Sequence, residues 1–246
     1  LEKGEFTIYY QPIVRLKDGK LIGVEALLRW YNPKLGHVSP VEFIPILEEL
    51  GLIIQTGKWI LKTASKQMKQ WLENGVLLEK LCVNVSPIQF HHEDFTDCLQ
   101  EILKETGLAP HYLELEITEG TLLNIDKTHN VFKKLQDIGI HISIDDFGTG
   151  YSSLGYLKKL PINTLKMDRS FITDMDADGK VIVNTMINMG KNLHFTVLAE
   201  GIEQKEQLDY LTAQGCDLGQ GYYWSKPVPA IDIHTLYKKI NKWKIV

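Results

Sequence analysis

Hydrophobic and polar positions follow two alternating spacings along the chain. Short runs rich in β-branched and aromatic residues, such as LCVNVS (81–86) and YLELEIT (112–118), precede longer segments with apolar residues every three or four positions. The short runs predict strands and the longer segments predict helices. Strands are also expected over residues 6–16, 20–30, 141–146, 163–168, 195–201 and 216–227. Helices are expected over residues 40–51, 56–75, 87–106, 126–138, 152–159 and 203–214, after Asp178, and at the C-terminus.

This alternation of strands and helices predicts a parallel α/β sheet. About eight strands in a chain of 246 residues fit a TIM-like (β/α)8 barrel better than an open sheet. Only the turn KDGK joins residues 6–16 to residues 20–30, so one early strand is expected to be antiparallel. No linker divides the chain, and we interpret residues 1–246 as one domain. The first residues read as the end of a helix, which indicates a piece of a longer, multidomain protein.

Polar residues stand where the predicted strands end. In a barrel of this type, the carboxyl ends of the strands meet at the face that carries the chemistry. Taken singly, each of these residues also fits a helix cap or a solvated strand end; together they suggest one site. The strand-end residues are Glu25, Asn84, Glu116, Asp145, Asp146, Lys166, Glu200 and Gln220.

The five carboxylates of this set would repel one another unless protons or cations neutralised them. Carboxylate and amide oxygens without histidine or cysteine suit Mg²⁺ or Mn²⁺ rather than zinc. Two metal ions about 4 Å apart would explain the adjacent Asp145 and Asp146, because one carboxylate can bridge both ions while its neighbour binds the second. Such an all-oxygen, two-metal site predicts hydrolysis of a phosphoester.

The composition limits which partners and which cellular compartment are expected. A formal net charge of −4 gives no overall basic face, so no DNA or RNA duplex is expected as a partner. The three cysteines form no C-x-x-C pair, which fits a reducing compartment. No apolar run approaches the roughly 20 residues of a membrane span. We expect a cytoplasmic domain, and any membrane tether of the full-length protein would lie in segments outside this sequence.

The motifs EALLRW, NVSP, EITE, DDFGTGYSSL, LKMDRSFI, AEGIE and QGYYWSKP resemble those of the EAL-domain phosphodiesterases, from about Phe6 to Pro229. The resemblance implies hydrolysis of cyclic di-GMP to linear pGpG with two Mg²⁺ or Mn²⁺ ions, on a barrel with one reversed strand. It further implies a homodimer and an upstream sensor or GGDEF domain. We expect the dimer contact near Tyr156 and Leu157, which look exposed in the sequence.

The resemblance also implies roles for single residues. Lys166 would orient the attacking water and help to deprotonate it, Gln220 would complete the pocket, Arg29 would grip a substrate phosphate, and Gln11 would lie at the substrate edge. The metal ligands it implies are Glu25, Asn84, Glu116, Asp145, Asp146 and Glu200.

Glu119 follows Glu116 by three residues, an odd spacing that points two strand side chains to opposite faces. We therefore interpret Glu116 as the metal ligand and Glu119 as a supporting residue just beyond the strand. Its expected partner is the loop FGTGYSS, with its backbone N–H groups and hydroxyls. The alternative is a glutamate that caps a helix or is solvated.

Two other functions stay open at this level. A silent receptor would bind cyclic di-GMP without hydrolysing it, although such relatives typically lose metal ligands or the DDFGTG loop, and this chain keeps both. A barrel enzyme that acts on a sugar phosphate would need a glycine-rich phosphate-binding loop late in the chain instead of a ring of acids.

Overall fold

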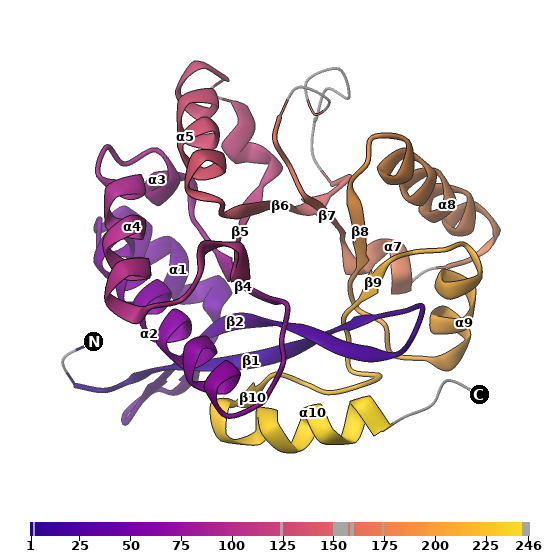
Figure 1. Ribbon diagram of the computed structural model, residues 1–246, viewed down its shortest axis with the longest axis horizontal. Helices are drawn as coiled ribbons and strands as arrows, with labels where there is room; N and C mark the ends of the chain where they lie inside the picture. The colour runs from indigo at the N-terminus through magenta and orange to yellow at the C-terminus, as the bar shows by residue number, and fades with distance from the viewer. Residues whose placement is uncertain (2, 124, 150–156, 158–159, 174, 243–246) are drawn as a thin grey trace.

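Eight strands close into a barrel in the part of the chain that the structure describes (Figure 1). The structure is a computed structural model that describes residues 1, 3–123, 125–149, 157, 160–173 and 175–242. The barrel strands are β1 (Phe6–Arg15), β2 (Lys20–Asn32), β4 (Lys80–Asn84), β5 (Leu113–Thr118), β6 (His141–Phe147), β7 (Thr164–Met167), β8 (Thr196–Ala199) and β9 (Leu218–Gly219). Two short strands, β3 (Gly36–Val38) and β10 (Val228–Pro229), extend the sheet at its ends.

β1 is the reversed strand. It pairs antiparallel with both β2 and β9 and so closes the ring, whereas the other neighbours from β2 to β9 pair in parallel. The expectations of a TIM-like barrel and of one antiparallel early strand are both confirmed.

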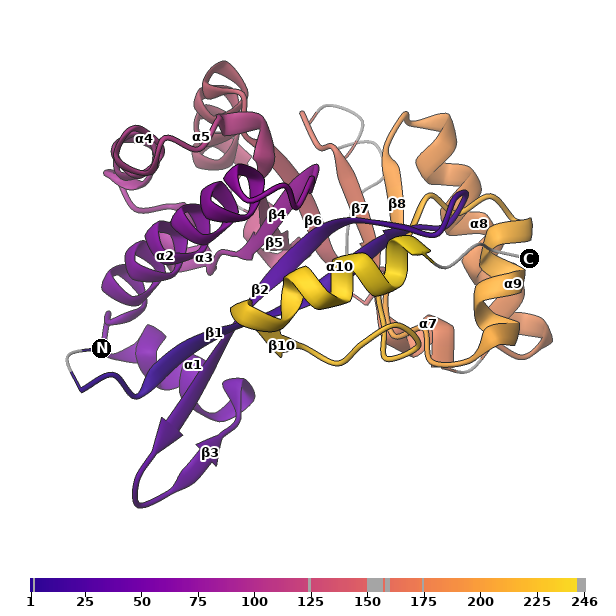
Figure 2. The same cartoon turned by 60° about the horizontal axis from the view of Figure 1, so that its bottom comes forward.

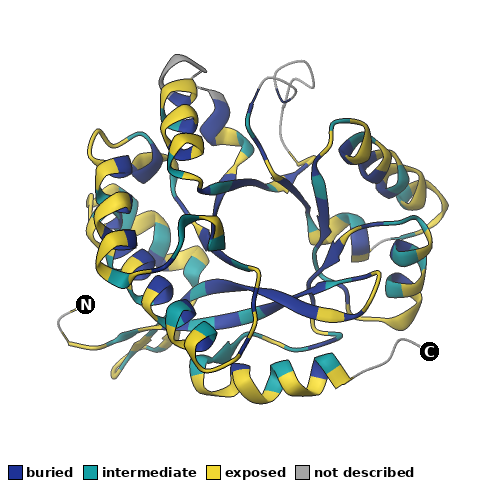
Figure 3. Ribbon diagram, viewed as in Figure 1, coloured by how far each residue is buried: buried dark blue, intermediate teal, exposed yellow. Residues whose placement is uncertain are grey.

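Helices cover the outside of the barrel and bury the faces that meet the strands (Figure 3). Beyond the ring, the β2–β3 hairpin and α1 project from one end (Figure 2). Among the described helices, none has both the length and the apolar character that a membrane crossing requires. The α-helices are α1 (Pro40–Glu49), α2 (Ile53–Glu73), α3 (Pro87–Phe90), α4 (Phe95–Thr106), α5 (Ile125–Ile138), α7 (Arg169–Thr173), α8 (Ala177–Asn192), α9 (Lys205–Ala213) and α10 (Ile233–Lys242). The 3-10 helices in the described residues are η1 (Pro110–Tyr112), η2 (Glu119–Leu123) and η3 (Ala230–Asp232).

The single helix expected over residues 87–106 is wrong, because α3 and α4 are separate helices. On a continuous helix Phe90 and Phe95 would point about 140° apart. The break lets both rings enter the core, where their centroids lie 6.0 Å apart.

The expectation of an exposed Leu157 is also wrong, since this side chain is fully buried. Tyr156 and most of the helix expected over residues 152–159 lie outside the described residues.

Side chains two positions apart on a strand fill the barrel in layers. Near the amino ends of the strands, Lys80 Nζ lies 2.5 Å from Glu114 Oε2. An apolar layer follows, formed by Ile13, Ile22, Cys82, Leu198 and Leu218. Glu116 and Lys166 lie two positions beyond Glu114 and Thr164 on their strands, so the period of two keeps them on the interior face, one layer nearer the carboxyl ends. The apolar layer closes the barrel beneath these polar groups.

Candidate active site

A pocket of about 240 Å³ opens at the carboxyl ends of the strands. Seven of the residues predicted for the site line it: Gln11, Glu25, Asn84, Asp145, Lys166, Glu200 and Gln220. The strands therefore gather side chains that are up to 209 positions apart in sequence.

Lys166 lies among the acids. Its Nζ is 2.8 Å from Glu200 Oε1, 2.9 Å from Glu116 Oε2, 3.0 Å from Asp145 Oδ1 and 3.9 Å from Glu25 Oε1. Only 1% of the Lys166 side chain is exposed. One buried ammonium group thus faces four carboxylates.

This arrangement moves several pKa values. Burial alone would lower the pKa of Lys166, but the surrounding carboxylates outweigh it and hold that pKa well above its ordinary value. Burial raises the pKa of Glu116 well above its usual range, against the opposing effect of Lys166. Burial likewise raises the pKa of Glu200 to about 7. Glu116 and Glu200 therefore hold protons more tightly than free carboxylates do.

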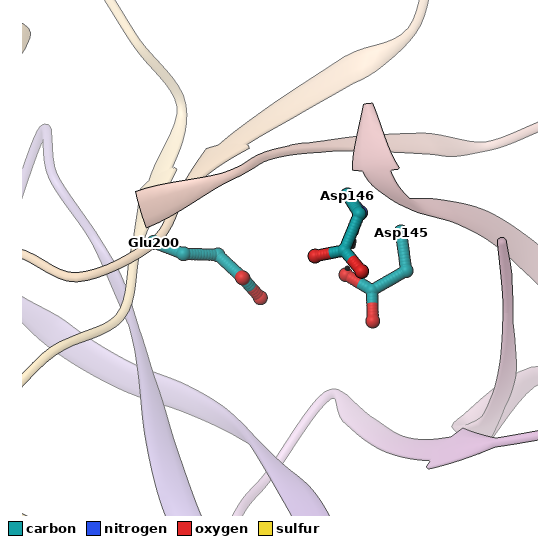
Figure 4. A group of neighbouring side chains, drawn as sticks. All are labelled: Asp145, Asp146 and Glu200. Atoms are coloured by element: carbon teal, nitrogen blue, oxygen red, sulfur yellow. Dashed lines mark hydrogen bonds between the residues drawn. The ribbon is translucent and has the colours of Figure 1, made fainter. Parts of the chain in front are cut away.

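Asp145 and Asp146 turn toward the same region although they are neighbours in sequence. Adjacent residues of a regular strand point to opposite faces. Here the register of β6 against β7 shifts between Ile144 and Phe147, and Asp146 has a φ of 52°, in the left-handed region. Carboxylate oxygens of Asp145, Asp146 and Glu200 lie within 4.8 Å of one another, and Figure 4 shows the three side chains together. The irregularity places both aspartates at one site, as bulges beside active sites do.

Amide side chains hold Glu25 on the other wall of the pocket. Asn84 Nδ2 donates to Glu25 Oε1 at 2.7 Å, and Gln220 Nε2 donates to Glu25 Oε2 at 2.6 Å. The same Gln220 nitrogen lies 3.1 Å from Gln11 Oε1. Both oxygens of Glu25 are thereby oriented.

Glu119 lies in η2, directly after β5 ends at Thr118. Its Oε1 accepts a hydrogen bond of 2.9 Å from the backbone N–H of Gly148, in the loop expected to be its partner. Gly148 has a φ of 96°, a backbone conformation that favours glycine, and a Cβ there would also lie 2.8 Å from Met186 Cε. Glu119 thus contacts the loop that follows the two aspartates.

Arg29 is not among the residues that line the pocket. It shares a face of β2 with Glu25, because their spacing is even. Its Nη1 donates to the backbone oxygen of Leu28 at 2.9 Å, and its guanidinium carbon lies 5.8 Å from the centre of the Tyr9 ring. Arg29 therefore lies farther out along the strand than the acids.

Sequence reasoning missed part of the pocket wall. Arg169, Glu203 and Tyr222 line it. Burial raises the pKa of Asp146, and the nearby charges of Asp145 and then Asp168 raise it further. Asp168 and Arg169 come directly after the strand over residues 164–167, and that position was the signal available for them.

The residues present fit divalent metal ions. Glu116 Oε1 is buried and has no hydrogen-bond partner among the described residues, so it is available as a ligand. The amide oxygen of Asn84 is also available, since its nitrogen makes the bond to Glu25. An all-oxygen donor set with three carboxylates in one group suits Mg²⁺ or Mn²⁺.

Comparison with known families and sequences gives a consistent match. The model of the EAL domain family matches residues 1–227. The chain is 42% identical over 233 residues to the bifunctional diguanylate cyclase/cyclic di-GMP phosphodiesterase MucR of Pseudomonas aeruginosa, covering 94% of this chain and 34% of MucR. It is 40% identical to the cyclic di-GMP phosphodiesterase NbdA of the same organism, covering 93% of this chain and 30% of NbdA. The chain thus spans about a third of the length of these relatives.

Solved structures agree with the fold. The phosphodiesterase of MucR in complex with cyclic di-GMP superposes with a TM-score of 0.91 at 41% identity, covering 94% of this chain and 95% of that one. An EAL domain protein from Listeria monocytogenes superposes with a TM-score of 0.84 at 32% identity, covering 97% and 94%.

Proposed function

The chain belongs to the EAL domain family, and on that premise we propose that it hydrolyses cyclic di-GMP to linear pGpG with two divalent metal ions. The observation that carries the proposal is the set of carboxylate oxygens around Lys166 Nζ, three of them within 3.0 Å, beside Glu116 Oε1, which has no hydrogen-bond partner in the described part of the chain. Support also comes from relatives named cyclic di-GMP phosphodiesterases and from the similar MucR structure in complex with cyclic di-GMP.

The reaction consumes one water molecule. Its oxygen bonds to one phosphorus, the bond from that phosphorus to the 3′ oxygen breaks, and the 3′ oxygen takes up a proton. The ring opens to a linear dinucleotide with a 5′ phosphate.

The proposed metal ligands are Glu25, Asn84, Glu116, Asp145, Asp146 and Glu200. Two Mg²⁺ or Mn²⁺ ions held there would screen the carboxylates, activate water and stabilise charge on the phosphate. Gln220 and Asn84 orient Glu25 for this task through their hydrogen bonds to its two oxygens.

Lys166 is the proposed group that orients the attacking water. Its raised pKa keeps it as an ammonium group, which donates hydrogen bonds and accepts none. Its part in removing the water's proton therefore runs through the bases it touches, of which Asp145 Oδ1 and Glu200 Oε1 also line the pocket.

Arg29 is the proposed contact of the phosphate that is cleaved, since a guanidinium can donate two parallel hydrogen bonds to phosphate oxygens. Gln11 and Gln220, which lie 3.1 Å apart across the pocket wall, are the proposed contacts at the substrate edge.

Chromatography of the products tests the proposal. The domain should convert cyclic di-GMP to pGpG with Mg²⁺ or Mn²⁺ and should be inactive with a chelator. Ca²⁺ should bind without supporting turnover, because it tolerates irregular coordination where two-metal chemistry needs short, fixed distances. Equal rates in Ca²⁺ and Mg²⁺ would contradict the two-metal mechanism, and binding without turnover under all conditions would identify a silent receptor.

The homodimer, the sensor or GGDEF domain elsewhere in the full-length protein, and the cytoplasmic location stay predictions. The burial of Leu157 removes one residue on which the expected dimer contact rested.

A further inference from the structure

The pocket has a second cation at its wall. Arg169 lines the pocket, and its side chain is exposed. Lys166 forms ion pairs with carboxylates, whereas the guanidinium of Arg169 makes no hydrogen bond or ion pair with any described residue. A guanidinium without a partner among the described residues thus stands at the edge of an acid-lined pocket.

Contacts at two neighbouring strand ends fix the position of Arg169. Asp168 Oδ1 accepts a hydrogen bond of 2.9 Å from the backbone N–H of Ser170, which fixes the start of α7. Gly201, after β8, lies so close that a Cβ there would be 2.6 Å from Arg169 Cβ. Arg169 is therefore presented by two neighbouring strand ends and not by a free loop.

Arg169 and Arg29 stand on opposite walls of the barrel. β2, which carries Arg29, and β7, which leads into Arg169, are separated by three strands on either side of the closed ring. The two guanidinium groups thus lie on opposite sides of the carboxyl end of the barrel.

The proposed substrate has two equivalent halves, and only one of its two phosphodiesters is cleaved. The other phosphodiester keeps its negative charge throughout the reaction. The pocket wall near Arg169 also carries the carboxylate of Glu203, which would repel that charge, so the phosphodiester needs a hydrogen-bond donor there. Resting on the proposed function, we infer that Arg169 binds the half of the dinucleotide that is not cleaved, and that it determines affinity for a cyclic dinucleotide over a simple phosphodiester.

Steady-state kinetics on two substrates tests this inference. Cyclic di-GMP has two phosphodiesters, and bis(p-nitrophenyl) phosphate has one. Arg169→Ala should raise KM for cyclic di-GMP about 10-fold or more, as expected for a lost charge-assisted hydrogen bond, with kcat within about twofold. Its kcat/KM for bis(p-nitrophenyl) phosphate should stay within about twofold of wild type. Arg169→Lys, which keeps the charge without the fork, should fall between.

Lys180→Ala is the matched control, because it removes an exposed positive charge from α8 outside this pocket. Its KM and kcat for cyclic di-GMP and its kcat/KM for bis(p-nitrophenyl) phosphate should equal those of the wild type. Inhibition by cyclic di-AMP, which has the same backbone and different bases, separates the two kinds of contact. If Arg169→Ala weakens inhibition by cyclic di-AMP as much as it weakens binding of cyclic di-GMP, Arg169 contacts the uncleaved phosphate. If inhibition by cyclic di-AMP is unchanged, Arg169 contacts a guanine edge.

An equal loss on both substrates, a loss confined to kcat, or no change on either substrate would overturn the inference. If the wild-type protein binds cyclic di-GMP without turnover, calorimetry replaces KM by Kd, and the proposed hydrolysis fails while the role of Arg169 is still tested. A wild-type Kd unchanged by Arg169→Ala would then overturn the inference alone.

Discussion

The ammonium nitrogen of Lys166 lies 2.9 Å from Oε2 of Glu116, and both side chains are almost completely buried. The remaining oxygen of Glu116 is buried without a hydrogen-bond partner among the described residues. The pair therefore balances charge at the base of the pocket and leaves one ligand position open. In the metal-free protein, Lys166 is the cation that holds the ring of acids together.

Lys166→Met should lower the free energy of unfolding by about 3 kcal/mol in the presence of a chelator, because it leaves buried carboxylates without their cation. Saturating Mg²⁺ should restore part of this stability and none of the activity. Urea denaturation with and without Mg²⁺ measures the difference. If Mg²⁺ restored no stability, the acids would not be the metal site.

Stability of the metal-free protein should fall with rising pH because of Glu200. Burial raises its pKa from 4.5 to about 7, so the folded state binds this proton more tightly than the unfolded state does. The resulting stabilisation is complete below about pH 4.5 and is lost as pH rises through about 7. Glu200→Gln cannot ionise, so its stability should depend less steeply on pH between 5 and 8, by about 2 kcal/mol over that range. Denaturation curves with a chelator at several pH values provide the test, and identical slopes for the two proteins would refute the assignment.

Glu25→Ala and Arg29→Ala should have different kinetic effects. Glu25 accepts hydrogen bonds from Asn84 and Gln220 at the proposed metal site, so its loss should abolish turnover. Arg29 lies farther out, and its loss should mainly raise KM by removing a phosphate contact. Steady-state kinetics on folded variants, checked by circular dichroism, distinguishes the two. If Glu25→Ala kept more than about a tenth of wild-type kcat, the proposed metal site would be wrong.

Glu119→Ala should fold normally and lose roughly 10–100-fold in activity or metal affinity, the usual effect of removing a residue that supports metal ligands. The reason is its hydrogen bond from Gly148, which ties η2 to the loop after Asp146. Excess metal should recover part of the loss. Glu93→Ala, an exposed glutamate between α3 and α4, is the control. Near-wild-type kinetics of Glu119→Ala at low Mg²⁺ would show that Glu119 has no supporting role.

The sequence by itself predicted the barrel, the reversed strand and most of the pocket. Two periods, one for strands and one for helices, are local properties that a chain shows without its fold. Strand-end positions such as Glu25, Asn84 and Glu200 could be located because parallel strands bring their carboxyl ends to one face. Residues next to a strand end were within reach of this reasoning, which nevertheless omitted Asp168 and Arg169 after β7.

Only the tertiary structure decided how these residues face one another. A strand period predicts that Asp145 and Asp146 point apart, and it is the register shift against β7 and the left-handed φ of Asp146 that bring them together. Likewise, the division between α3 and α4 and the burial of Leu157 depend on which neighbours each side chain meets in the core. The position of Lys166 among four carboxylates depends on the closed barrel, because those acids come from four other strands or strand ends. Sequence periodicity encodes which face a side chain takes, whereas distances between strands are set by how the whole sheet closes and packs.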